Sequence, residues 1–326
     1  MRFVLRQLAK LVITVFAVSL ITFAMLFVLS KNGSTQGRNQ IAVNIAGIGA
    51  NDAQLAQVEK EYGLDKPVIV QYGKWMGKLL TGDLGVSYAT NTKVSDAVKD
   101  RLPVSLWLMF WAQLIALTAA IALGTAAAYR ANGPFDRAAS TFAFGLLSLP
   151  HYVIGVVLQL FLAVKLGWFD AVSTYASPFD SPTRHIKAFF LPALTLALGQ
   201  VAVYMRLLRA DMVATLQNDY ITMARAKGMS TRVVLFRHAL RPSTFSMITA
   251  AGVNVGALIG GTVIVEQIFD LKGMGSLVVE AVLRRDLLVV QICVVIFAVA
   301  FVVVNFLVDM LYTVIDPRIR HARGLA

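Results

Sequence analysis

The sequence has little cysteine and little charge. Cys293 is the single cysteine among 326 residues, so an intrachain disulfide and a cysteine-based metal cluster are both excluded. Charged residues make up 15% of the chain, against about 25% in a typical globular domain. Hydrophobic residues make up 57% and gather in long runs. This pattern is typical of an integral membrane protein and largely excludes soluble enzyme folds.

The sequence also lacks the motifs of common catalytic sites. It contains no G-x-x-x-x-G-K-[ST] phosphate loop, no H-E-x-x-H pair and no G-x-S-x-G nucleophile elbow. The four histidines are scattered, and His151 in an apolar run fits a packing histidine better than a proton or ligand site. We therefore predict no catalytic, cofactor-binding or metal site in this chain, so any use of ATP falls to other subunits.

Six long apolar runs predict an all-α membrane protein with six transmembrane helices. A bilayer core needs about 20 apolar residues in a helix. The predicted spans are residues 11–29, 104–129, 138–164, 188–205, 244–265 and 287–315. Pro150 and Pro192 fall inside two of them, where we expect kinks that leave the spans intact.

Basic residues indicate which ends of the spans face the cytoplasm, because Lys and Arg remain preferentially on that side. The N-terminal flank, the turn after the second span and the C-terminal tail are all basic. The connection between the fourth and fifth spans carries Arg206, Arg209, Arg225, Lys227, Arg232, Arg237 and Arg241. The segment from Glu266 to Asp286 is net negative and fits the outside. We predict that both termini are cytoplasmic, and the net charge of +12 is then an orientation signal and not a sign of nucleic-acid binding.

These spans divide the chain into regions. They are an N-terminal flank with the first span (1–29), an extracytoplasmic segment (30–103), a transmembrane core (104–315) with a cytoplasmic loop (206–242), and a cytoplasmic tail (316–326). Apolar residues at helical spacing predict helices over 54–62 and 68–80. These helices fit either the membrane interface or a docking surface for an external partner.

The cytoplasmic loop predicts two short helices separated by a glycine. Asp219 is a candidate N-cap for a helix over 220–227, and Gly228 fits the left-handed residue that ends it. A second helix is expected to begin at Ser230 and to stop before Pro242.

Small side chains in this loop would admit a close partner. Ala224, Ala226 and Gly228 form a small-sided surface flanked by Arg225 and Lys227. A solvated basic turn has the same composition, so the pattern alone leaves both interpretations open.

Small and polar residues also mark the spans. Small residues recur every fourth position at Ala112, Ala116, Ala120, Gly124 and Ala128, and again at Gly252, Gly256 and Gly260. Such stripes let helix backbones approach closely in lipid, within one chain or, for the glycine stripe, at a subunit seam or moving gate. Further packing or gate candidates are Glu266 and the polar face of the last span with Asn305 and Asp309. That face fits a structural hydrogen-bond site better than an ion or proton relay.

The cytoplasmic loop resembles the coupling loop of ABC-importer permeases, most closely the dipeptide and oligopeptide group. The resemblance lies in the sequence Tyr-Ile-Thr-Met-Ala-Arg-Ala-Lys-Gly-Met-Ser from Tyr220 and in Arg237-His-Ala-Leu-Arg241. Further likeness lies in Tyr62-Gly-Leu-Asp-Lys-Pro67, Gly82-Asp-Leu-Gly85, Gly273-Met-Gly275, Arg285-Asp286 and the ending from Asn305 to Arg320. Lys272 stands where the family usually has proline.

The resemblance implies a type I ABC importer permease that forms half of a translocation pore for di- or oligopeptides. Nickel and glutathione permeases are similar, and a stand-alone channel or an intramembrane enzyme remains an alternative. The implied partners are a second homologous permease, two cytoplasmic ATPases that bind ATP and Mg, and an extracytoplasmic binding protein, in a bacterial cytoplasmic membrane. The implied ATPase-coupling residues are Tyr220, Ala224, Arg225, Ala226, Lys227, Gly228, Met229, Arg237 and His238.

Overall fold

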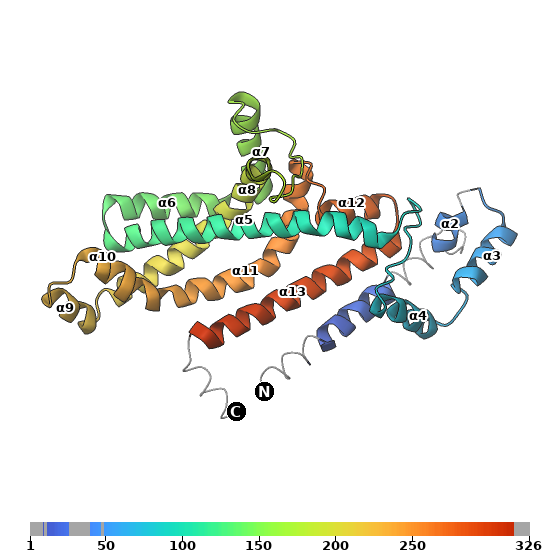
Figure 1. The fold of residues 1–326 in the computed structure, drawn as a ribbon, viewed down its shortest axis with the longest axis horizontal. Coiled ribbons are helices and arrows are strands. Elements are labelled where there is room, and N and C mark those ends of the chain that lie inside the picture. The colour runs from blue at the N-terminus through green and yellow to red at the C-terminus, as the bar shows by residue number, and fades with distance from the viewer. Residues whose placement is uncertain (1–8, 10–11, 26–39, 47–48, 316–326) are drawn as a thin grey trace. The chain divides into compact units, whose positions relative to one another are not determined.

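The computed structural model describes residues 9, 12–25, 40–46 and 49–315, and this part of the chain is predominantly helical (Figure 1). The predicted all-α class is confirmed, because the one β-type pairing among these residues is an isolated bridge between Val86 and Lys93. The chain forms two compact units. The first unit comprises Met1–Pro103 and Gly273–Phe306, and the second unit comprises Val104–Lys272 and Leu307–Ala326.

The helices are named in chain order. They are α2 (Gln40–Ala46), α3 (Asp52–Tyr62), α4 (Val68–Leu80), α5 (Val94–Tyr129), α6 (Pro134–Ser148), α7 (His151–Leu158), the π-helix η1 (Gln159–Lys165), α8 (Pro182–Thr215), α9 (Asp219–Ala226), α10 (Thr231–Val233), the π-helix η2 (Val234–Ala239), α11 (Leu240–Ile268), α12 (Met274–Leu283) and α13 (Leu287–Ile315).

Four helices of the described part are long and apolar enough to cross a membrane. They are Val94–Tyr129, Pro182–Thr215, Thr231–Ile268 and Leu287–Leu307. A fifth span results if α6 and the following α7–η1 segment count as one. The first predicted span is described over Val12–Met25, a shorter apolar helix. The total of six spans therefore remains a prediction.

The predicted third span, residues 138–164, is broken in the structure. Pro134–Ser148 and His151–Lys165 are bent by 104° at the intervening Leu149 and Pro150. The residue before a proline is driven out of the helical region, and Leu149 accordingly has φ −101° and ψ 130°. The expectation of a mere kink at Pro150 was wrong, whereas Pro192 lies inside the uninterrupted α8.

We predicted that the second helix of the cytoplasmic loop stops before Pro242, and this was wrong. α10, η2 and α11 together form one helix of 38 residues, Thr231–Ile268. The π-helix η2 ends at Ala239, three residues before Pro242. A π-segment changes the hydrogen-bond register of a helix. The proline, which lacks an N–H, falls in the first turn after this change and is tolerated there.

α8 is the central helix of the second unit. It contacts α6, α7 and α11, and 67% of its most apolar window is buried, against 28% or less in the other three long helices. Asp136 near the start of α6 is almost fully buried and forms an ion pair with Arg209 of α8. The Asp136 carboxylate also accepts a hydrogen bond from the Asn132 amide at 2.8 Å. α6 is thus attached to α8 by charge as well as by apolar packing.

The alanine and glycine stripe of α5 packs within the chain. Ala112, Ala116 and Ala120 are fully buried, and Ala128 is 3% exposed. A Cβ built on Gly124 would lie 3.1 Å from the Met205 carbonyl oxygen and 3.2 Å from Leu208 Cδ2, both of α8. The absence of a side chain at Gly124 therefore permits close approach of the α5 and α8 backbones.

The first unit is built around aromatic contacts between α4 and the helix over Val12–Met25. The Tyr72 hydroxyl lies 2.9 Å from the Ser19 hydroxyl. The Tyr72 ring makes edge contacts with the rings of Phe16 and Phe23, with centroids 5.9 and 5.4 Å apart. Tyr72 is 8% exposed. The predicted helix over 68–80 is confirmed, and its Tyr face packs on protein in the first unit.

We predict that Gly124→Leu destabilises the protein and that Gly260→Leu does not. Both changes improve helix propensity, but at Gly124 a larger side chain meets α8, and overpacking costs about 1–3 kcal/mol. At Gly260 no atom lies within 4 Å of the Cβ position. Thermal unfolding of the two purified variants in the same detergent measures the difference, and equal unfolding temperatures would contradict this packing.

Candidate functional site

The candidate site is the end of the second unit where α8 finishes and the 38-residue helix begins. α9 connects these two long helices along the chain, lies at the tip of this end and contacts η2 (Figure 1). Ile221 of α9 is fully buried, and it joins Val234 and Leu235 in the main apolar cluster of the second unit. α9 is therefore a fixed part of this unit, anchored through one face.

A second side of α9, adjacent to the buried one, carries exposed apolar residues. Tyr220 is 45% exposed and Met223 is 58% exposed. Their spacing of three residues places them on one side of the helix. Arg225 and Lys227 are also exposed. α9 thus presents a tyrosine, a methionine and two cations to its surroundings.

Two details of the predicted loop were wrong. Ala224 does not belong to an outward small-sided surface, because it is 7% exposed and packs in the same cluster as Ile221. The N-cap position of α9 is occupied by Asn218, not Asp219, and Asn218 makes no side-chain capping hydrogen bond. Asp219 is the first helical residue, where its negative charge faces the positive end of the helix dipole.

Gly228 ends this helix as predicted. Its φ is +76°, in the left-handed region that L side chains rarely adopt. The Met229 amide then donates to the Ala224 carbonyl at 3.3 Å, closing the turn. Ala226 and Met229 are both exposed on this turn.

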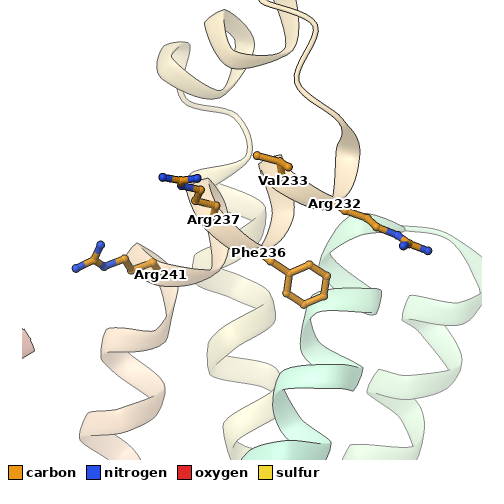
Figure 2. A pocket seen from close by; sticks show the side chains of 5 residues that line it. All are labelled: Arg232, Val233, Phe236, Arg237 and Arg241. Atoms are coloured by element: carbon orange, nitrogen blue, oxygen red, sulfur yellow. The ribbon is translucent and has the colours of Figure 1, made fainter.

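A pocket of about 510 Å³ opens beside α9 on the supporting helix. Its lining is Arg232, Val233, Phe236, Arg237 and Arg241. Figure 2 shows Arg237 and Arg241 directed to one side of the helix and Arg232 and Phe236 to the other. Val233 is 40% exposed and Phe236 is 57% exposed. The pocket therefore combines an apolar floor with three guanidinium groups.

The positive charge of this end has no ion-pair partner in the part of the chain that the structure describes. Among the described residues, no carboxylate lies within ion-pairing distance of Arg232, Arg237 or Arg241. Arg225 on α9 and Lys227 just after it likewise make no ion pair in that part of the chain. The surface is strongly cationic and suits an anionic ligand or an acidic partner surface.

Sequence reasoning missed several of these residues. Met223 and Phe236 were not singled out, although Met223 follows Tyr220 at helical spacing, and Arg232 was named only for its charge. Arg237 and His238 belong to η2, which supports α9, and His238 is half-buried.

The predicted gate candidates lie in different environments. Gly252 is buried, Gly256 half-buried and Gly260 exposed. Glu266, predicted at the outer end of the fifth span, is fully buried inside α11, and its carboxylate accepts a 2.6 Å hydrogen bond from Ser105 of α5.

The polar face of the last span is described in part. Asn305 donates to its own helix, from Nδ2 to the Phe301 carbonyl at 2.9 Å. The Asp309 side chain and all of Asp316 lie outside the described residues. The predicted site on this face stays a prediction.

A second polar cluster lies in the first unit, where two segments of the family motif meet. Asp286, at the start of α13, is 2% exposed and accepts hydrogen bonds from the Ser87 hydroxyl and the Ala89 amide. Its other oxygen accepts from the Val289 amide at 3.3 Å, within the first turn of α13. The segment around Gly85 and the Arg285–Asp286 pair are thus brought together from distant parts of the sequence.

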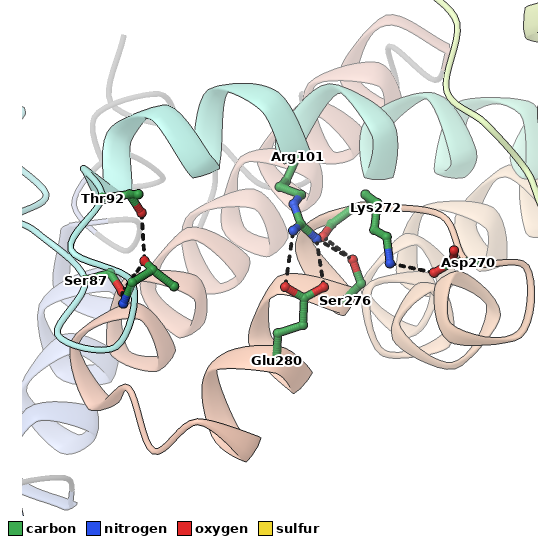
Figure 3. A network of polar contacts seen from close by, with 9 residues as sticks. Ser87, Thr92, Arg101, Asp270, Lys272, Ser276 and Glu280 are labelled. Atoms are coloured by element: carbon green, nitrogen blue, oxygen red, sulfur yellow. Dashed lines mark hydrogen bonds and ion pairs between the residues drawn. The ribbon is translucent and has the colours of Figure 1, made fainter. Parts of the chain in front are cut away.

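An arginine clamp accompanies this cluster. Arg101 of α5 donates to both carboxylate oxygens of Glu280 at 3.3 and 3.2 Å, and to the Ser276 hydroxyl at 3.0 Å (Figure 3). A planar guanidinium fits a carboxylate in this bidentate manner. The clamp joins the start of α5 to α12.

We predict that Asp286→Ala lowers the free energy of unfolding by about 1–3 kcal/mol, because it leaves buried donors without an acceptor. Lys272→Ala is the matched control, since it removes the exposed pair between Lys272 and Asp270. An exposed pair of this kind contributes about 0–1 kcal/mol. Thermal unfolding of both purified variants provides the comparison, and equal losses would exclude a stabilising role of the Asp286 cluster.

Together these features define a multi-span helical membrane protein with an exposed cationic end. Residues 120–321 match the family described as binding-protein-dependent transport system inner membrane component. Residues 1–109 match the N-terminal part of the membrane components of such systems. The chain belongs to the family of binding-protein-dependent transport system inner membrane components, which confirms the resemblance to ABC-importer permeases.

Individual relatives extend the likeness over the whole chain. A protein of Brucella abortus (strain 2308) named as a peptide transport system permease is 36% identical over 318 residues, 98% of each chain. The oligopeptide transport system permease protein AppB of Bacillus subtilis (strain 168) is 38% identical over 83% of this chain and 88% of its own length. The glutathione transport system permease protein GsiC of Salmonella paratyphi A is 33% identical over 98% of this chain and 99% of its own.

Proposed function

We propose that this chain is one permease subunit of an ATP-driven importer of di- or oligopeptides. The observation that carries the proposal is the exposed face of α9, with Tyr220 and Met223, on a helix anchored between two membrane-spanning helices. Such a face can receive force from a partner and pass it to the spans. The peptide transport names of relatives that cover 98% and 83% of the chain support peptide as cargo.

The proposed assembly supplies what this chain lacks. A second homologous permease completes the pore, two cytoplasmic ATPases bind ATP and Mg, and an extracytoplasmic binding protein delivers the peptide. The basic residues of the cytoplasmic loop support an orientation with α9 and both termini inside a bacterial cytoplasmic membrane. ATP-driven closure of the ATPases then tilts the spans through α9 and switches the pore between inward and outward access.

The glycine stripe of α11 is a proposed seam with the second permease. Gly260 is exposed and its Cβ position is open, so a neighbouring backbone from another chain has room to approach. Glu266 has a different role in this scheme, because its carboxylate is fully buried and bonded to Ser105.

We predict that Met223→Glu abolishes ATP-dependent peptide uptake and the copurification of the ATPases without preventing membrane insertion. The side chain is 58% exposed, so the added charge disturbs a docking surface and not the core. Leu283→Glu is the matched control, because Leu283 is 79% exposed at the end of α12 and lies outside the cytoplasmic loop 206–242. Retention of the ATPases by the Met223 variant, or equal loss in both variants, would refute docking through α9.

The relative named for glutathione transport, 33% identical over 98% of the chain, makes glutathione the second candidate cargo. We expect unlabelled di- and tetrapeptides to reduce uptake of a labelled tripeptide in cells that depend on this transporter, whereas glutathione competes weakly. Uptake of labelled glutathione that peptides do not reduce would instead assign glutathione as the cargo. Cells lacking this chain provide the background uptake.

A further inference from the structure

The arginine-lined pocket beside α9 is not required by the docking of α9. Its five lining residues lie on α10, η2 and the first residues of α11, on the helix that supports α9. Tyr220 and Met223, which form the exposed face of α9, are not among them. The pocket is therefore a surface separate from the exposed face of α9, and its ligand has to be considered separately.

The position of the pocket along the helix restricts what that ligand is. The helix Thr231–Ile268 is charged at its beginning, and its remaining part is long and apolar enough to cross a membrane. The pocket lies at the change from one part to the other, with Arg241 in the first turn of α11. Such a boundary falls at the level of lipid headgroups when the apolar part lies in the bilayer.

The chemistry of the lining matches a lipid headgroup. Arg232, Arg237 and Arg241 have no carboxylate partner among the described residues, and an arginine guanidinium binds phosphate in a bidentate manner. Val233 and Phe236 are exposed between them and offer an apolar surface to an acyl chain. Basic clusters next to a membrane span attract anionic lipids.

We propose that this pocket binds one anionic phospholipid of the inner leaflet, with its phosphate held by the pocket arginines and an acyl chain against Val233 and Phe236. The proposal rests on the proposed function only for the side of the membrane that this end faces. A bound lipid of this kind offsets part of the positive charge of the supporting helix and fixes its depth in the bilayer. A partner ATPase would then meet α9 at a defined height.

The test is lipid retention by the purified full-length chain, measured by native mass spectrometry during titration with phosphatidylglycerol or phosphatidylcholine. The variant is the triple change Arg232→Gln, Arg237→Gln and Arg241→Gln. The control is Arg137→Gln, Arg225→Gln and Lys227→Gln, which removes the same charge from exposed residues outside the pocket.

We expect tighter binding of phosphatidylglycerol than of phosphatidylcholine, and a loss of about fivefold in that affinity for each pocket arginine removed. The control should change the affinity by less than about twofold, because its exposed residues do not line the pocket and their charges are screened by salt. Single Arg237→Gln and Arg241→Gln variants serve if the triple variant does not fold. Equal binding of the two lipids, or equal losses in variant and control, would overturn the proposal.

A third result would overturn it in a different way. Unchanged phosphatidylglycerol binding in the pocket variant, together with loss of copurified ATPases, assigns the pocket to the ATPase interface. Lipid retention is measured without transport, so its failure leaves the proposed permease function standing. Failure of ATPase docking in the Met223→Glu variant, in turn, leaves the lipid site standing.

Discussion

Close approach of helix backbones around α8 is the constraint on which the second unit depends. Lipid provides no hydrophobic drive for helices to associate, so contact must come from small side chains, polar bonds and dense packing. α8 meets this requirement with buried Ala193, Ala197 and Ala202, while Gly124 of α5 brings a second backbone close to it. The buried Asp136–Arg209 pair adds a charged bond at the end of the same helix that leads to α9.

Side chains also form hydrogen bonds with the irregular backbone of this unit. Such bonds are needed because little water is present inside a membrane to satisfy backbone polar groups. The amide of Gln159 donates to the Ala171 carbonyl at 2.7 Å and to the Ile268 carbonyl at 3.1 Å. One side chain thereby ties η1 to the loop that follows it and to the end of α11. The buried His185 performs a similar task, with hydrogen bonds to Trp111 at 2.9 Å and to the Ala176 carbonyl at 2.7 Å.

Local rules predicted the elements whose causes are local. The bounds of α4 and α13 coincide with the predicted 68–80 and 287–315, because hydrophobic spacing and turn residues act within a few positions. The left-handed Gly228 was predictable for the same reason. The break at Pro150 was visible as a proline, but its angle of 104° depends on where α7 packs against α8 and α11.

The error at Ala224 and the unpredicted partners of two buried carboxylates both involve contacts between residues that are separated in the sequence. Ala224 has the size of a docking residue, yet whether it faces out depends on Val234 and Leu235, ten residues further along. In the sequence, Glu266 has the charge of a typical surface residue. Its burial is explained by Ser105, 161 residues away, which donates a hydrogen bond to it. The same holds for the bond between Ser87 and Asp286. The spacing of residues in one sequence carries no information on such pairings. The family motifs, in contrast, identified the cytoplasmic loop as a candidate coupling loop.

The continuity of the helix Thr231–Ile268 has a mechanical consequence. At a rise of about 1.5 Å per residue, its 38 residues form a rod of about 57 Å that begins beside α9. A continuous helix of this length can carry a displacement from α9 to residues near Ile268. The π-helix η2, where the hydrogen-bond register changes, lies next to the end where that force would enter.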